Sequence, residues 1–193
     1  MLSVVVLISG SGSNLRALLE ACDNPLFPAK VLAVGADCPA PGLAHAEEFD
    51  VSTFVVENRY FASRDAWALR IAEHIDLLQP DLIVLAGFMK ILPPVFVNRY
   101  RGKLVNLHPS LLPQFPGAHA VRDALAAGAT KTGSTIHLVD EGVDTGRILM
   151  QQEIDIPAGI SESDLHERIK TTEREQLVRF VYEVAAKEIT LEV

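Results

Sequence analysis

The chain of 193 residues carries a net charge of −8, and 49% of its residues are hydrophobic. This length suits a single domain with a substantial core. The negative charge argues against broad binding to nucleic acid or to anionic membranes, so we expect small-molecule partners. The longest apolar stretch, near residues 82–97, is interrupted by Lys90, Pro93 and Pro94, which argues against a membrane span.

Short apolar runs alternate with amphipathic segments along the chain, which is the pattern of βαβ units. We predict strands at residues 2–8, 31–35, 53–56, 82–86, 104–107, 134–139 and 148–154. Helices are predicted at residues 14–22, 43–49 and 63–78, and from residue 161 to about residue 187. The predicted fold class is α/β, with a mostly parallel twisted sheet of about seven strands and helices on both faces.

Cys22 and Cys38 are the only cysteines, and neither belongs to a CxxC pair. A zinc site or a disulfide framework therefore has little support. Metal-ligand spacing is also missing elsewhere in the sequence, so we predict no metal. The N-terminal segment lacks the basic region and the cleavage pattern of a secretion signal, and we expect a cytoplasmic protein.

The first predicted strand runs into a glycine-rich turn with the sequence SGSGSNL at residues 9–15. Glycines allow a close backbone approach, and the following helix offers free N–H groups, so this turn could hold a phosphate. Leu15 stands where the dinucleotide fingerprint has its third glycine, and the segment lacks the Gly-Lys-Ser/Thr ending of a P-loop. An ordinary turn capped by Ser13 is the alternative interpretation.

Asn106 and His108 lie at the end of the fifth predicted strand, and Pro109 stops further pairing. Because they are two residues apart in a strand, their side chains project from the same face. The carboxyl edge of a parallel sheet is where such folds bind ligands. An amide can donate to a developing oxyanion, and a carboxylate partner would keep the imidazole basic enough to be protonated near neutral pH. We therefore predict an acyl-transfer site rather than a structural histidine.

The loop at residues 140–146 supplies three candidate carboxylate partners for the histidine, namely Asp140, Glu141 and Asp144. Spacing does not rank them, and all three could equally be solvated loop acids. The sequence has no Gly-x-Ser-x-Gly elbow, which weakens a serine-hydrolase interpretation of Ser110.

Two further charged residues lie in unusual positions. Arg64 follows the predicted cap Ser63 in the first turn of its helix, where a cation opposes the helix dipole. An external anion would account for it, although exposed arginines often tolerate such positions. Glu173 falls within the apolar stripe of the last helix, where a carboxylate needs a partner.

Four segments together resemble the phosphoribosylglycinamide formyltransferases, and the resemblance extends over nearly the whole chain. They are ISGSGSNL at residues 8–15, AGFMKIL at 86–92, NLHPSLLPQFPG at 106–117 and DEGVDTG at 140–146. Each segment alone is ambiguous, whereas the four together are specific. The resemblance implies one Rossmann-like formyltransferase domain over residues 1–193. Its N-terminal half would bind the ribonucleotide, and its C-terminal half would bind folate and carry the catalytic residues.

The resemblance also implies the reaction and the residues that serve it. A formyl group would pass from the co-substrate 10-formyltetrahydrofolate to the amine of glycinamide ribonucleotide, in purine synthesis. Catalysis is assigned to Asn106, His108 and Asp144, which selects Asp144 among the loop acids. The implied ribonucleotide ligands are Gly12, Ser13, Asn14 and Glu173, and the implied folate contacts are Arg64, Met89, Lys90, Ile91 and Leu92. Relatives occur as monomers and as dimers, which leaves a homodimer open.

Two residues depart from the family pattern. Thr135 stands where relatives often have serine, and Arg147 replaces a common proline after the acidic loop. Formyltetrahydrofolate hydrolases and the formyltransferases that act on transfer RNA or sugar nucleotides share the catalytic trio, but they carry additional domains. A catalytically silent folate or phosphoribosyl sensor is a further alternative, although a pure binder would not need the trio.

Overall fold

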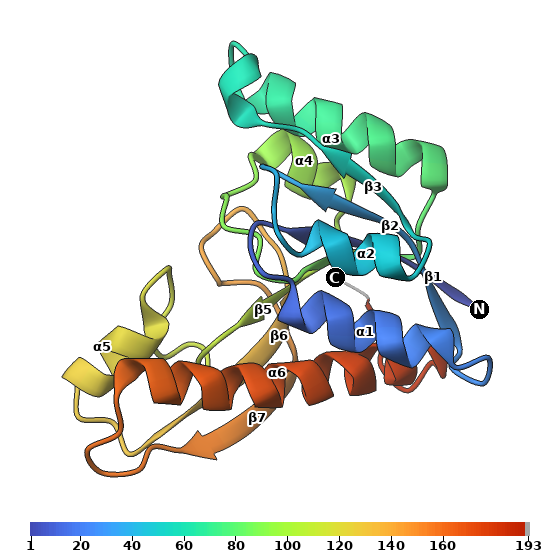
Figure 1. The fold of residues 1–193 in the computed structure, drawn as a ribbon. Helices are drawn as coiled ribbons and strands as arrows, with labels where there is room; N and C mark the ends of the chain where they lie inside the picture. The colour runs from blue at the N-terminus through green and yellow to red at the C-terminus, as the bar shows by residue number, and fades with distance from the viewer. Residues whose placement is uncertain (192–193) are drawn as a thin grey trace.

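The computed structural model describes residues 1–191 and places one seven-stranded sheet at the centre of the chain (Figure 1). The strands are β1 Leu2–Ile8, β2 Ala29–Ala36, β3 Ser52–Val55, β4 Leu82–Leu85, β5 Leu104–His108, β6 Lys131–Leu138 and β7 Ile148–Asp155. Their order across the sheet is β3-β2-β1-β4-β5-β6-β7. Strands β1 to β5 pair in parallel, whereas β6 pairs antiparallel with both β5 and β7. The prediction of a mostly parallel sheet of seven strands is confirmed.

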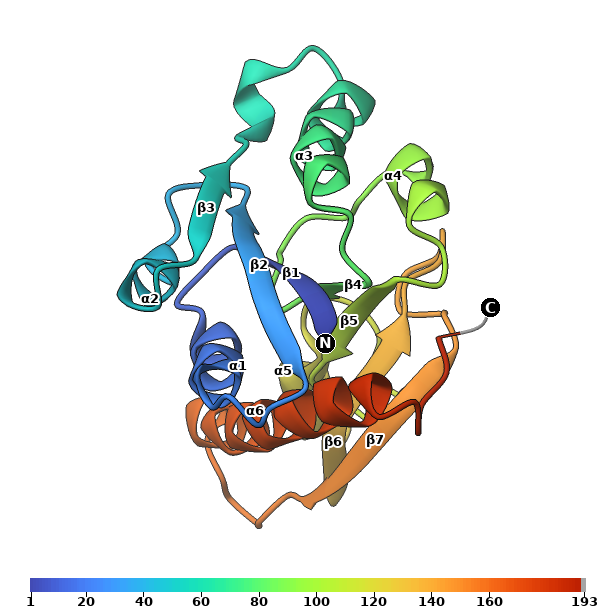
Figure 2. The same cartoon turned by 90° about the vertical axis from the view of Figure 1, so that its right-hand side faces the viewer.

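Helices cover both faces of the sheet. They are α1 Ser13–Asp23, α2 Leu43–Glu48, α3 Arg64–Leu78, α4 Pro94–Arg99, α5 Ala120–Ala126 and α6 Glu162–Ala185, with a 3-10 turn at Asn58–Tyr60. Alternate residues of β1 enter two cores, because Val4 and Val6 pack with α1 and α6 while Val5 and Leu7 pack with α3 and α4. Figure 2 shows α1 and α6 on one side of the sheet and α3 and α4 on the other.

The predicted helices are confirmed, and two short ones were missed. The Ser63 hydroxyl accepts from the amide of Ala66 at 3.1 Å, as the predicted cap requires. Helix α4 begins at Pro94, a residue that the sequence suggested only as a break in an apolar stretch. Proline suits the first helical position because the amide that it lacks has no partner there anyway. Helix α5 has seven residues and no side-chain cap, so its sequence carries little helical signal.

Two of the candidate segments follow β1 and β4, where the strand order of the sheet reverses. Strand β1 pairs with both β2 and β4, so the chain winds to either side of it, and ligands of open α/β sheets bind beyond the strand ends at such a point. The loops after β1 and β4 are joined there. The Ser9 amide donates to the Gly87 carbonyl at 3.1 Å, and the Met89 amide donates to the Ser9 hydroxyl at 2.8 Å. These bonds hold the glycine-rich turn against the segment implied to bind folate.

Candidate active site

The catalytic candidates lie on one face of the strand pair β5 and β6. Asn106 pairs with His137 across the two strands, and His108 pairs with Thr135. Residues paired directly in an antiparallel ladder share a face of the sheet, so four polar side chains gather on it. Leu107, between the two candidates in β5, points the other way into the core against α1 and α6. The strand alternation predicted from the sequence is therefore confirmed.

Asp144 is held against two histidines. Its Oδ2 lies 3.3 Å from Nδ1 of His108, and its Oδ1 lies 3.5 Å from Nε2 of His137. The amide of Gly117 also donates to Oδ2 at 2.7 Å. Burial alone would raise the pKa of Asp144, but these contacts outweigh it and lower the pKa to about 2. The side chain is therefore a carboxylate throughout the neutral range.

The other two loop acids have different partners. Asp140 accepts hydrogen bonds from an amide and a hydroxyl of its own loop, at 3.0 and 2.7 Å. Glu141 accepts from the side-chain amide of Asn98 at 2.7 Å. Of the three loop acids, Asp144 is therefore the one that contacts His108.

His137 belongs to the cluster and was missed in the sequence. Its Nδ1 donates to the carbonyl of Leu138 at 2.8 Å, since a carbonyl oxygen can only accept. Its Nε2 lies 3.3 Å from Nδ2 of Asn106, and it also faces Asp144. His137 therefore fixes the side-chain amide of Asn106. His137 lies two residues after Thr135 in a predicted strand. Its place on the same face as Asn106 follows only from the pairing of β6 with β5, which the sequence does not reveal.

The protonation of His108 differs from the expectation. Burial lowers its pKa below the ordinary value, and this effect exceeds the opposing influence of the Phe115 carbonyl and the Asp144 carboxylate. The contact with Asp144 does raise the pKa of His108, as predicted, but the net shift is downward, so the prediction of a more basic imidazole is wrong. The Nε2 atom of His108 lies 2.8 Å from the Phe115 carbonyl and must donate to it. The unliganded site thus holds a histidine biased toward its neutral form.

The glycine-rich turn ends at Gly12, which is the N-cap of α1. Its φ of 71° is in the left-handed region that favours glycine, and no side chain caps the helix there. The alternative in which Ser13 caps the turn is wrong, because Ser13 is already the first residue of α1. The first-turn amides of a helix without a side-chain cap are available to an anion.

Asn14 and Glu173 join the glycine-rich turn to the last helix. The Asn14 side-chain amide donates to the Glu173 carboxylate at 3.1 Å, and both residues are buried. Burial raises the pKa of Glu173 more than this bond and nearby cations lower it. Asn14 Oδ1 has no hydrogen-bond partner within the described part of the chain. The partner expected for Glu173 is present, and the pair retains polar capacity for a ligand.

Residues 89–92 form the segment between β4 and α4. Met89 and Ile91 are exposed by 74% and 66%, whereas Leu92 is buried. Exposed apolar side chains of this size beside a polar cluster suit an apolar ring system. Arg64 at the start of α3 donates through Nη2 to the carbonyl of Ile91. Its unusual position is therefore explained in part by a contact with this segment.

Lys90 contacts a residue that follows β2. Its ammonium lies 3.8 Å from Oδ2 of Asp37, a buried aspartate just after β2. The Lys90 side chain remains 46% exposed, so it can still meet a ligand. Residues Arg64, Met89, Lys90, Ile91 and Leu92 thus lie on one connected segment or contact it.

The two departures from the family pattern leave the cluster intact. The Thr135 hydroxyl donates to the Ser110 carbonyl at 2.6 Å and accepts from the Leu112 amide at 3.2 Å. It therefore ties down the segment after β5. Arg147 donates to the carbonyl of Thr190 at 2.6 Å, which directs its charge toward the end of the described chain rather than toward Asp144.

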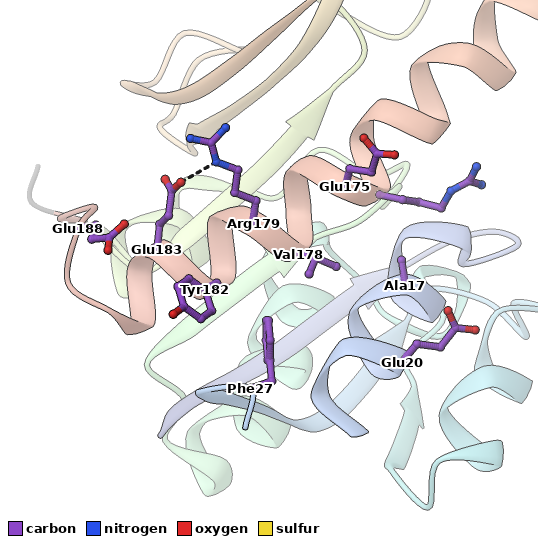
Figure 3. Close-up of a pocket in the computed structure, with 10 residues that line it drawn as sticks. Ala17, Glu20, Phe27, Glu175, Val178, Arg179, Tyr182, Glu183 and Glu188 are labelled. Carbon is purple, nitrogen blue, oxygen red and sulfur yellow. Dashed lines mark hydrogen bonds and ion pairs between the residues drawn. The ribbon is translucent and has the colours of Figure 1, made fainter. Parts of the chain in front are cut away.

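A separate hollow of about 730 Å³ lies between α1 and α6 (Figure 3). Its floor includes Phe27, Val178 and Tyr182, and on its rim Arg179 pairs with Glu183 at 2.6 Å. None of the candidate site residues lines it. The hollow is therefore distinct from the catalytic cluster.

Within residues 1–191, no group of three His, Cys, Asp or Glu side chains is placed to hold a metal ion. Over the same residues, no helix has the length and apolar character needed to cross a membrane. Both cysteines are free.

Comparison with known proteins gives matches over most of the chain. Residues 2–181 match the family model described as formyl transferase. The phosphoribosylglycinamide formyltransferase of Mycobacterium tuberculosis H37Rv is 48% identical over 188 residues, covering 97% of this chain and 87% of the relative. The Escherichia coli K12 protein of that name is 41% identical over 173 residues, covering 89% and 82%.

A solved structure gives the same result. The crystal structure of phosphoribosylglycinamide formyltransferase from Brucella melitensis superposes with a TM-score of 0.90 at 41% identity, covering 95% of each chain. The fold and the match to the family model thus agree over almost all of the sequence. The chain belongs to the formyl transferase family and is a formyltransferase.

Proposed function

We propose that the enzyme transfers the formyl group of 10-formyltetrahydrofolate to the amine of 5′-phosphoribosylglycinamide. The observation that carries this proposal is the cluster of Asn106, His108, His137 and Asp144. It is accompanied by two unlike binding segments, which follow β1 and β4 of the same sheet. One segment offers helix amides to a phosphate, and the other offers exposed apolar side chains to a ring system. Such a pairing suits a phosphorylated acceptor and a folate donor.

The two ligands would occupy different residues. Gly12, Ser13 and Asn14 hold the phosphate end of the ribonucleotide, and the buried Glu173 carboxylate accepts from a hydroxyl or amide beyond it. Folate binds along residues 89–92 and presents its formyl group to Asn106 and His108. Arg64 can exchange its bond to Ile91 for the carboxylates of the folate tail.

Asn106 stabilises the charge that develops during transfer. As the amine adds to the formyl carbon, the formyl oxygen becomes negative, and the Asn106 side-chain amide donates to it. His137 fixes the orientation of that amide by its contact with Nδ2. Preorganisation of this kind avoids the cost of turning the donor during the reaction.

His108 handles the proton. Because burial favours its neutral form, His108 can take up the proton that the attacking nitrogen must lose. Asp144 then stabilises the imidazolium across the 3.3 Å contact, and the proton passes on to the departing folate nitrogen. For this step the Nε2 atom of His108 must release the Phe115 carbonyl, and the ring proton must shift to Nδ1, where it is donated to Asp144. Nε2 is then free to accept the proton of the attacking nitrogen.

The same proposal places the enzyme in the cytoplasm with small molecules as its only required partners. Two free cysteines suit a reducing compartment.

The proposal is tested by following tetrahydrofolate release from 10-formyltetrahydrofolate with and without the ribonucleotide. Release that depends on the ribonucleotide supports it. Equal release without the ribonucleotide would instead identify a hydrolase, and no release would favour a sensor or a different acceptor.

A further inference from the structure

A second segment of the chain is packed against the glycine-rich turn. The amide of Gly42, just before α2, donates to the carbonyl of Gly10 at 3.0 Å. A Cβ atom placed on Gly12 would lie 2.9 Å from Cα of Gly42 and 3.5 Å from Cδ2 of His45. The Cδ2 edge of the His45 ring therefore borders the N-terminus of α1, where the phosphate is proposed to bind.

The tautomer of His45 follows from the contact that its Nδ1 atom makes with Arg16. Nη1 of Arg16 lies 3.2 Å from Nδ1 of His45, and a guanidinium group can only donate. Nδ1 must therefore accept, which leaves the ring proton of neutral His45 on Nε2. That nitrogen is bonded to Cδ2, so the N–H group belongs to the edge beside Gly12. The tautomer and the position together make His45 a hydrogen-bond donor at the phosphate subsite.

Arg16 is itself held in place by two carboxylates. Its Nε donates to Glu20 at 2.9 Å along α1, and its Nη1 donates to Glu48 of α2 at 3.0 Å. The guanidinium charge is thus largely matched by carboxylates, and its remaining role toward His45 is to orient the ring and select the tautomer. Helix amides and an imidazole N–H group can then bind the phosphate together.

We propose that His45 is a ligand of the substrate phosphate and donates its Nε2–H to a phosphate oxygen. The inference rests on the proposed function, because it adds one side chain to the phosphate subsite at Gly12, Ser13 and Asn14. Each of the three terminal oxygens of a phosphomonoester can accept more than one hydrogen bond, so the group can take more donors than the first-turn amides supply. His45 supplies an additional donor from α2, and Arg16 is the residue that positions it.

The test compares a phosphorylated acceptor with its dephosphorylated form in His45→Ala. For 5′-phosphoribosylglycinamide we expect KM to rise about ten- to a hundredfold, the effect of losing a hydrogen bond to a charged group. The KM for 10-formyltetrahydrofolate and the activity toward the nucleoside that lacks the phosphate should both remain unchanged. His45→Gln, which retains an N–H donor, should restore part of the affinity, and His74→Ala, at a histidine stacked on Phe54, should have no effect.

Two outcomes would overturn the inference. One is an unchanged KM for the ribonucleotide in His45→Ala, and the other is an equal loss with and without the phosphate, which would mark His45 as a purely structural link between α1 and α2. NMR provides a readout independent of turnover. In the wild-type protein, ribose 5-phosphate should shift the Nε2 resonance of His45, with Nδ1 unprotonated. If the enzyme fails to formylate the ribonucleotide but this shift appears, the proposed function fails while the phosphate site stands, and absence of the shift refutes the site.

Discussion

Asp144→Asn removes a charge from the catalytic cluster while keeping the shape of the side chain. The surroundings hold the pKa of Asp144 at about 2, compared with an ordinary value of 3.8. This difference favours the charged form by roughly 2 kcal/mol, because one pKa unit is about 1.36 kcal/mol. His108 supplies only one of the contacts that make up this difference, besides those with His137 and Gly117. About thirtyfold is therefore the upper limit for the fall in kcat when the variant leaves a protonated His108 without its carboxylate.

Steady-state kinetics and NMR titration together check this prediction. In Asp144→Asn the pKa of His108 should fall further below its ordinary value, since the carboxylate contact is one of the two that raise it. Asp140→Asn is the matched control, because Asp140 bonds only within its own loop. A kcat within threefold of wild type in Asp144→Asn, or an equal loss in the control, would refute the assigned role of Asp144.

Three further predictions concern the rest of the site. Asn106→Ala should lower kcat by roughly a hundred- to a thousandfold, as removal of one oxyanion donor does elsewhere, and a loss confined to KM would contradict this role. Gly12→Ala should weaken ribonucleotide binding and lower the thermal midpoint, because its Cβ would lie 2.9 Å from Gly42 at a positive φ; unchanged KM and stability would contradict this packing. Burial raises the pKa of Glu173 in the folded protein above the ordinary value of 4.5. The folded wild-type protein is therefore most stable at low pH, where Glu173 is protonated, and it loses that stability as the pH rises from 4.5 through the pKa of the folded state. Glu173→Gln should therefore unfold at a higher temperature than wild type near pH 8 and lose that advantage near pH 4, and a pH-independent difference would contradict the assignment.

Much of the fold could be predicted because strand alternation and helix caps are local signals. All seven strands overlap their predicted ranges, and the predicted cap Ser63 is present. The antiparallel direction of β6 and β7 was not predicted, because an apolar run does not reveal the direction of its neighbour. Helix α4 was hidden because its two leading prolines resemble a break.

The site could be predicted only as far as single segments allow. Asn106 and His108 were identified by their spacing within one strand, whereas His137 required the register between two strands. The net direction of the His108 pKa also lay outside the sequence, since it depends on how deeply the ring is buried. Residues from α1 and α2 likewise meet beside Gly12 through packing that no motif encodes.

The most direct test follows an isotopically labelled formyl group by mass spectrometry in wild type and in His108→Ala. With the wild-type enzyme we expect the label on the amine of 5′-phosphoribosylglycinamide, and we expect this product to be nearly abolished in the variant. Folding of the variant is checked by its thermal midpoint. Label recovered as free formate, or transfer that persists at the wild-type rate in His108→Ala, would contradict the central claim.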